Sequence, residues 1–190
     1  MKPEYDEIEF ANTKLWRAWL NAHYADTDGV WLRMYKKATD IKTVTYAEAL
    51  DEALCYGWID GQVKKKDDIS YIQKFTPRRK NSMWSKRNIE HVARLEAEGR
   101  LMPSGLSEIA RAKSDGRWDQ AYDKPSEMVM PEYFLDALKS RPKALEFYTT
   151  LNKTNIYAIA WRLQTAKTDE TRKRRQDKII TLLNAKQKLH

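Results

Sequence analysis

The sequence has little of what disulfide-stabilised, metal-binding or membrane-spanning proteins need. Its 190 residues include one cysteine, Cys55, so no intrachain disulfide can form and a reducing compartment fits best. The three histidines, His23, His91 and His190, are far apart and offer no zinc-ligand spacing. No apolar run approaches the roughly 20 residues of a membrane-spanning helix. The acidic start has no apolar signal core. These absences predict a cytoplasmic protein with no metal, cofactor or membrane insertion.

Charge and aromatic side chains are abundant instead. Charged residues make up 33% of the chain, hydrophobic residues 42%, and there are seven tryptophans, which is a globular composition. The formal net charge of +8 is uneven. Residues 62–94 carry ten Lys or Arg against three Asp or Glu, and residues 162–190 carry nine against three. Two basic segments favour phosphate-bearing partners, although such a surface also serves solubility alone.

Patterns in the first part of the chain predict helices around a small sheet. Residues 12–23 have the apolar spacing of a helix, and residues 30–37 alternate as a strand does. Thr45 and Glu48 form a capping box, which opens a helix that ends before Gly57. Within that helix Cys55 is expected to pack in the core, and the adjacent acids 51–52 are expected to diverge.

Residues 58–76 are predicted to form two antiparallel strands that meet near residues 66–68. Gly61 indicates a bulge in the first of them, although a tight turn at Asp60–Gly61 is the alternative. Ser85 then caps a helix. Its expected buried stripe consists of Ile89, Val92 and Ala93. The sequence thus predicts an α+β fold with a small antiparallel sheet of about three strands and flanking helices.

The chain beyond Arg100 reads as helical. A short helix is expected over residues 104–113 and an extended loop over residues 114–130. Later helix starts are marked by Pro131, Pro142, Thr154 and the cap Thr168. The expected domains are a sheet domain over residues 1–100, a connecting arm over 101–130, and a helical C-terminal part over 131–190 that packs on the first.

The loop at residues 76–87 is the sharpest candidate site. Pro77 restricts its backbone, and two guanidinium groups follow that bind phosphate or carboxylate in a fork. A tryptophan there can stack on a base, and the amides of the next helix also favour an anion. The predicted ligand-binding residues are Arg78, Arg79, Trp84, Ser85 and Lys86. The alternative is that the two arginines pair with acids such as Asp60 while Trp84 fills core.

Asp60 lies in the block GWIDG, which lacks the repeated glycines and lysine of a phosphate loop. We therefore interpret Asp60 as a residue that orients an arginine, contacts a ligand or satisfies backbone amides. Its role stays open at this level.

A second basic face is expected on the last helix. Arg172 and Arg175 fall on the same side as its buried leucines and isoleucine at about 100° per residue, with Arg174 behind. Arginines on a core-facing stripe need an anionic partner. Asp60, Glu48 or a bound anion would fill that role.

Several segments together resemble the YdeI/OmpD-associated family, whose members are also labelled bacteriocin-protection proteins. They are GWIDG at 57–61, TPRR at 76–79 with WS at 84–85, WRAWL at 16–20, RLEAEGRLMP at 94–103 and AKTDETRKRR at 166–175. Lys80 and Tyr56 stand where the family commonly has proline and phenylalanine. The resemblance implies a small bacterial protein linked to bacteriocin or envelope-stress protection, and it brings no agreed catalytic residues.

Three functions are therefore open. The first is a non-enzymatic protein that binds an anionic ligand or a protein partner through Arg78, Arg79, Trp84 and Lys86. The second is a nucleic-acid-binding protein that uses both basic segments. The third is an enzyme acting on an anionic small molecule, with Asp60 as acid or base, which requires a pocket that joins Asp60 to the arginines. We favour the first, and the oligomeric state is not predicted.

Overall fold

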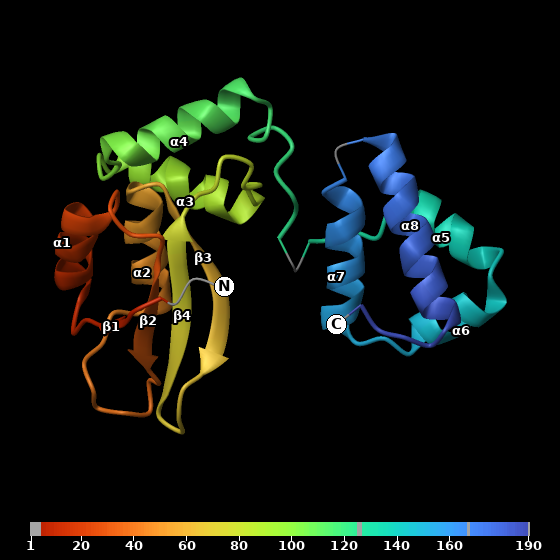
Figure 1. Ribbon diagram of the computed structural model, residues 1–190, viewed down its shortest axis with the longest axis horizontal. Coiled ribbons are helices and arrows are strands. Elements are labelled where there is room, and N and C mark those ends of the chain that lie inside the picture. The colour runs from red at the N-terminus through yellow and green to blue at the C-terminus, as the bar shows by residue number, and fades with distance from the viewer. Residues whose placement is uncertain (1–4, 125–126, 167, 190) are drawn as a thin grey trace. The chain divides into compact units, whose positions relative to one another are not determined.

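The computed structural model describes residues 5–124, 127–166 and 168–189, which form two compact units (Figure 1). Unit 1 comprises residues 1–82 and 88–119, and unit 2 comprises residues 83–87 and 120–190. The first unit contains a sheet with helices and the second is helical, so the α+β prediction is confirmed. Residues 125–126 of the predicted loop, Lys167 of the C-terminal motif and His190 lie outside the described residues.

The sheet of unit 1 has four strands in the order β1-β2-β4-β3. They are β1 (Glu7–Glu9), β2 (Val30–Tyr35), β3 (Trp58–Lys65) and β4 (Ser70–Pro77). The three predicted strands are antiparallel neighbours as expected, with the register shift between Asp60 and Val63 that Gly61 indicated. The prediction of a purely antiparallel sheet was wrong, because β1 adds a short parallel strand beside β2.

Four helices accompany the sheet: α1 (Thr13–His23), α2 (Tyr46–Cys55), α3 (Lys86–Ala97) and α4 (Pro103–Ser114). Asn12 caps α1, and the capping box at Thr45 and Glu48 is present in both directions. The stripe predicted for α3 needs correction, because Ala93 is exposed. The buried residues of α3 are Asn88, Val92 and Leu95.

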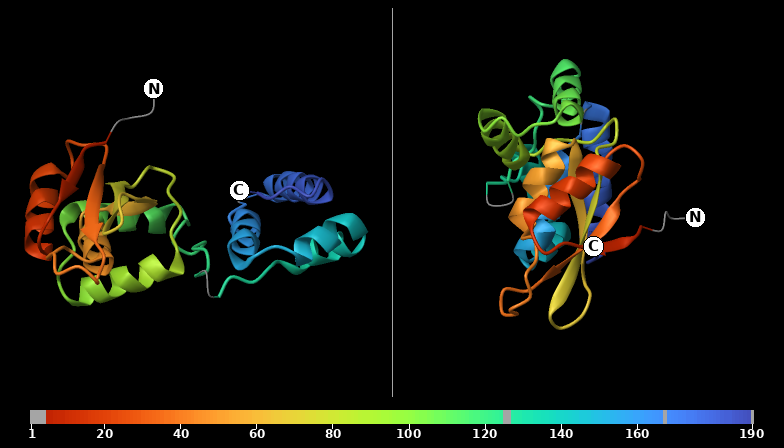
Figure 2. Two further views of the ribbon diagram at one scale, coloured as in Figure 1. Left: turned by 90° about the horizontal axis from the view of Figure 1, so that it is seen from below. Right: turned by 90° about the vertical axis from the view of Figure 1, so that its left-hand side faces the viewer.

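The core of unit 1 lies between one face of the sheet and the helices α1 and α2, which lie side by side (Figures 1 and 2). Alternate residues of β2 point into it: Val30, Leu32 and Met34 are all buried. Trp16 of α1 packs against Phe75 of β4 with ring centroids 5.7 Å apart. The opposite face of the sheet points away from this core.

Helix α4 approaches α2 closely at Gly105. A Cβ atom at Gly105 would lie 2.2 Å from the carbonyl oxygen of Cys55, which is a severe overlap. The absence of a side chain at Gly105 therefore allows the close backbone contact between the two helices. The sequence around Pro103 indicated only a break between two segments.

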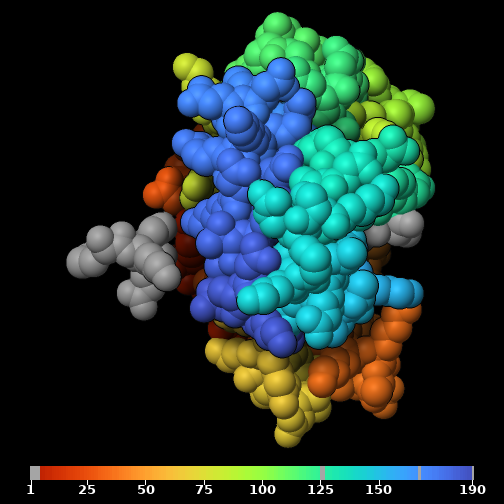
Figure 3. Space-filling view, turned by 90° about the vertical axis from the view of Figure 1, so that its right-hand side faces the viewer, coloured from red at the N-terminus to blue at the C-terminus, as the bar shows by residue number. Residues whose placement is uncertain are grey.

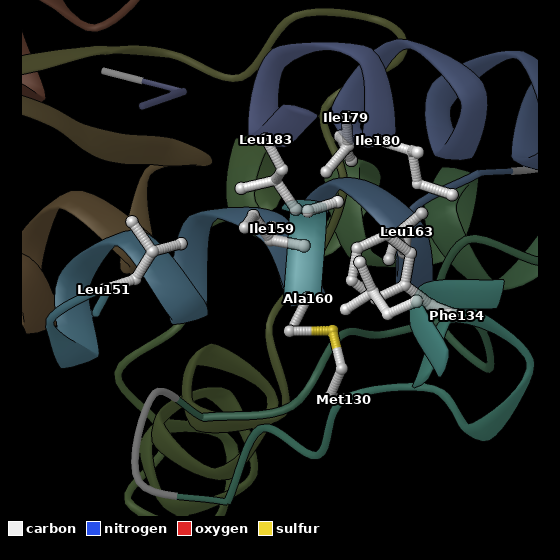
Figure 4. Packing of buried hydrophobic residues seen from close by; sticks show 11 residues of the cluster. Met130, Phe134, Leu151, Ile159, Ala160, Leu163, Ile179, Ile180 and Leu183 are labelled. Carbon is white, nitrogen blue, oxygen red and sulfur yellow. The ribbon is translucent and has the colours of Figure 1, made fainter. Parts of the chain in front are cut away.

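Unit 2 consists of α5 (Glu132–Lys139), α6 (Pro142–Thr149), α7 (Lys153–Gln164) and α8 (Asp169–Asn184). Thr168 caps α8 as predicted, by accepting a hydrogen bond from the amide of Thr171 at 3.1 Å. Helices α6 and α8 are neighbours and form one face of the unit (Figure 3). Buried side chains of α5, α7 and α8 pack together in the core of the unit (Figure 4). Among the described residues of both units, no helix is long and apolar enough to cross a membrane.

Candidate anion-binding site

The two candidate arginines follow β4 on a short, closed turn. The amide of Arg78 donates to the carbonyl of Gly57 at 3.0 Å, which extends the sheet by one bond. The amide of Arg79 donates to Ser82 Oγ at 3.0 Å, and the amide of Ser82 donates back to the carbonyl of Arg79 at 2.8 Å. These reciprocal bonds fix the backbone, so the guanidinium groups start from defined positions.

Arg117 anchors the same turn from the end of α4. Its side chain is buried, and Nη1 donates to the carbonyl of Ser82 at 2.7 Å. Its Nε lies 2.8 Å from both carboxylate oxygens of Asp115, across a glycine at φ +75°. Sequence reasoning missed this residue, because an Asp-Gly-Arg turn predicts a loop and gives no sign that the arginine points inward.

A cavity of about 310 Å³ lies beside the turn. Its lining residues are Tyr5, Asp28, Thr76, Pro77, Arg78 and Arg79. Arg78 is buried, whereas Arg79 is exposed and is therefore the more accessible cation. Gly29 keeps the neighbouring backbone close, because a Cβ atom there would lie 2.6 Å from the Phe75 carbonyl. The arrangement suits a small anion, which must tolerate the nearby Asp28 carboxylate.

Asp60 belongs to a different part of unit 1. It accepts a hydrogen bond from the Tyr46 hydroxyl at 2.9 Å and pairs with Phe75 in the register of β3 and β4. It is not among the residues that line the arginine cavity. Among the described residues, the cavity at the arginines therefore does not include Asp60, which the acid–base hypothesis requires.

Trp84, Ser85 and Lys86 belong to unit 2, unlike the two arginines. The carbonyl of Trp84 accepts from the amide of Tyr122 at 3.1 Å, and the amide of Lys86 donates to the carbonyl of Tyr122 at 2.9 Å. Lys86 Nζ lies 2.6 Å from Asp123, and this hydrogen bond raises the pKa of Lys86. The five residues of the predicted loop site are thus divided between two units, and neither unit contains all of them.

The arginines of α8 find partners within unit 2. Arg175 Nη1 donates to the carbonyl of Arg162 at 2.6 Å and to Thr165 Oγ1 at 3.1 Å. Within unit 2, the partners of this arginine are therefore groups at the carboxyl end of α7. Arg172 pairs with Asp169 at 2.6 Å, and Arg174 is exposed.

An ion-pair network that the sequence did not reveal joins α1, α2 and α3. Glu52 is 3% exposed and lies 2.5 Å from Arg17 and 2.7 Å from Arg100. Asp51 points the other way, 2.7 Å from His91 and 2.6 Å from Arg94. The two adjacent acids diverge as predicted. Nothing in the described ranges brings three His, Cys, Asp or Glu side chains together as metal ligands.

Cys55 is buried beside this network and is poorly suited to act as a nucleophile. Burial raises the pKa of its thiol to about 11, and the charge of Glu52 adds to the increase. The thiolate is the reactive form, so little of it is present near neutral pH. Cys55 packs in the core, as the sequence suggested.

We expect Asp51→Asn to lower the free energy of unfolding by about 1 kcal/mol at neutral pH. Burial raises the pKa of Asp51, but hydrogen bonds from Arg94 and His91 outweigh it and hold that pKa below its ordinary value. A carboxylate whose pKa is lower in the folded state stabilises the fold fully at a pH above its unfolded-state pKa of about 4. This stabilisation is lost as the pH falls through the folded-state pKa.

Urea unfolding of both proteins across the pH range measures this difference. The gap between wild type and Asp51→Asn should be largest above the unfolded-state pKa of about 4 and should close as the pH falls through the lower folded-state pKa. A gap that stays constant into strong acid would show that Asp51 acts through packing alone.

Two family models match the chain, and each match falls largely in one of the two structural units. A model described as "Domain of unknown function (DUF8412)" matches residues 8–108. A model described as "Bacteriocin-protection, YdeI or OmpD-Associated" matches residues 127–186. The second match confirms the predicted family through the C-terminal motif, whereas the segments at 57–61 and 76–79 fall in the first. No curated protein matches the chain, and no solved structure matches it.

Proposed function

Since the chain belongs to the family described as a domain of unknown function (DUF8412), with a C-terminal unit of the YdeI or OmpD-associated family, we propose that it is a non-enzymatic binding protein for an anionic ligand. The ligand carries phosphate or carboxylate and enters the cavity at Arg78 and Arg79. The family description names bacteriocin protection. We extend that role to this chain, and we further propose a part in envelope-stress protection and a cytoplasmic location.

One observation supports this proposal: the turn at Arg78 and Arg79 has a fixed backbone and lies beside a cavity. Arg79 is exposed and lines the cavity together with the buried Arg78, on a backbone held by Ser82 and Arg117. Preorganised guanidinium groups lose less conformational entropy when they bind, so they favour a bidentate anion. A volume of about 310 Å³ fits a phosphate, a diphosphate or the charged end of a larger molecule.

We expect Arg79→Gln to weaken the binding of inorganic pyrophosphate about tenfold, the loss of one charge-assisted hydrogen-bond pair. Isothermal titration calorimetry of the full chain at low salt measures the change. Arg79 is exposed, so its replacement should leave the thermal midpoint unchanged.

Two further variants separate the site from net charge. Lys80→Gln removes the same charge from the next, exposed residue, which does not line the cavity, and should change the affinity less than twofold. Asp28→Asn removes the carboxylate from the cavity and should raise the affinity. Equal losses in Arg79→Gln and Lys80→Gln, or no pyrophosphate binding at all, would overturn the proposal.

A further inference from the structure

The outward face of the sheet in unit 1 carries aromatic and basic side chains. In β2, Trp31, Arg33 and Tyr35 alternate with the buried core residues and therefore point to the other face. The register places Lys74 opposite Trp31 and Ile72 opposite Arg33. Beyond the bulge, Lys64 pairs with Ile72 and joins the same face. Each of these side chains is partly or fully exposed.

The rings and ammonium groups of this face contact one another. Lys64 Nζ lies 4.4 Å from the centre of the Trp31 ring, and Lys74 Nζ lies 5.8 Å from it. Lys74 Nζ also lies 5.1 Å from the centre of the Tyr5 ring. Tyr5 in turn lines the cavity of Arg79. One continuous surface therefore runs from Lys64 through Trp31, Lys74 and Tyr5 to Arg79, and we call it the cation–aromatic track.

The acidic side chains of this face have basic or hydroxyl partners. Glu7 lies 2.6 Å from Lys66 Nζ. Glu9 accepts a hydrogen bond from the Tyr35 hydroxyl at 2.9 Å and lies 4.0 Å from Arg33. In the described ranges neither Lys64 nor Lys74 is in an ion pair with a carboxylate, and each ammonium group lies over an aromatic ring instead.

We propose that the cation–aromatic track binds single-stranded nucleic acid. A phosphate occupies the cavity at Arg79, so the inference rests in part on the proposed anion site. Bases stack on Trp31 and Tyr5, while Lys64 and Lys74 leave the ring faces and pair with the adjoining phosphates. Stacking of a base on a tryptophan is stronger than the contact of an exposed ammonium with the same ring, so the exchange favours the bound state.

The geometry favours a single strand over a duplex. In a duplex the base faces are stacked on one another and cannot reach a ring on a sheet, whereas an unpaired strand exposes them. Lys74 lies beside both Trp31 and Tyr5, so bases stacked on the two rings would share one ammonium group near their phosphates.

The test is fluorescence anisotropy with the full chain, a labelled oligothymidine of about ten nucleotides and a duplex of the same length. Trp31→Leu should weaken oligothymidine binding about tenfold, and Trp31→Phe, which keeps an aromatic face, should stay within about twofold of wild type. Lys64→Gln/Lys74→Gln should weaken it and reduce the slope of log affinity against log salt by about one to two. Lys37→Gln/Lys42→Gln, the same charge change on an exposed loop of unit 1, should alter binding less than about twofold.

Circular dichroism confirms that each variant is folded. Binding of the duplex as tightly as the single strand, or equal affinities for Trp31→Leu and Trp31→Phe, would overturn the inference.

The pyrophosphate titration separates the two proposals. If pyrophosphate binds and depends on Arg79 while oligothymidine does not bind, the anion site stands and the nucleic-acid inference fails. If Arg79→Gln has no effect on pyrophosphate but Trp31→Leu abolishes oligothymidine binding, the track acts without the cavity and the anion site fails.

Discussion

Glu52→Ala should lower the free energy of unfolding of unit 1 by about 3 kcal/mol. The Glu52 carboxylate is almost fully buried and joins α1 to the segment after α3, through Arg17 at 2.5 Å and Arg100 at 2.7 Å. Arg17 Nη2 also donates to the carbonyl of Arg100 at 3.2 Å. Removing the carboxylate takes from Arg17 its ion-pair partner and leaves Arg100 paired with Glu98 alone.

The size of the effect follows from the exposure of the partners. Breaking a buried ion pair costs about 3–5 kcal/mol when the remaining charge cannot reach water. The side chains of Arg17 and Arg100 are 33% and 31% exposed, so they can turn partly toward solvent, which places the loss near the low end. Burial lowers the pKa of Arg100, but the hydrogen bonds that it donates to Glu98 and Glu52 outweigh this effect and raise that pKa.

Urea unfolding followed by circular dichroism measures the loss, and Glu98→Ala is the matched control. Glu98 contacts Arg94 and Arg100 from the exposed edge of the same network, so its removal should destabilise unit 1 much less than the removal of Glu52. Similar losses in the two variants would show that Glu52 contributes no more than a surface ion pair.

Local signals explain what the sequence could predict of this fold. The capping box at Thr45, the hairpin turn near Asp67 and the bulge after Asp60 each depend on residues close in sequence, and each is present. Strand β1 was missed because its three residues, two of them glutamates, have no strand pattern of their own. It forms only because β2 offers an unpaired edge, which is long-range information.

Prediction of the candidate site was also limited to residues that are close in sequence. Pro77 followed by two arginines identified this turn from sequence alone as a candidate for anion binding, and both arginines line a cavity. The sequence could not show that Trp84, five residues further on, belongs to another compact unit. Nor could it show Trp31 beside Lys64 and Lys74, because that track is assembled from three strands by their register.

Phe134→Ala should destabilise unit 2 by about 4 kcal/mol, within the range observed for large-to-small changes in cores. Phe134 is fully buried in α5 and belongs to the cluster that includes Leu138, Ile159 and Leu163 (Figure 4). Its ring meets Tyr148 of α6 edge-on, with centroids 6.3 Å apart. A unit of this size holds a small apolar core, so one lost phenylalanine removes a large share of its stability.

Hydrogen exchange read helix by helix tests both the magnitude and the independence of the units. Amides of α5, α7 and α8 should lose protection in Phe134→Ala, while amides of α2, β2 and β4 keep theirs, because the substituted side chain belongs to the core cluster of unit 2. Tyr133→Ala changes the neighbouring residue, which is 37% exposed, and should cost less than about 1 kcal/mol. Loss of protection in both units together would mean that they unfold as one cooperative body. Loss of amide protection in unit 2 alone would agree with the two family models, which match residues 8–108 and 127–186 as distinct segments.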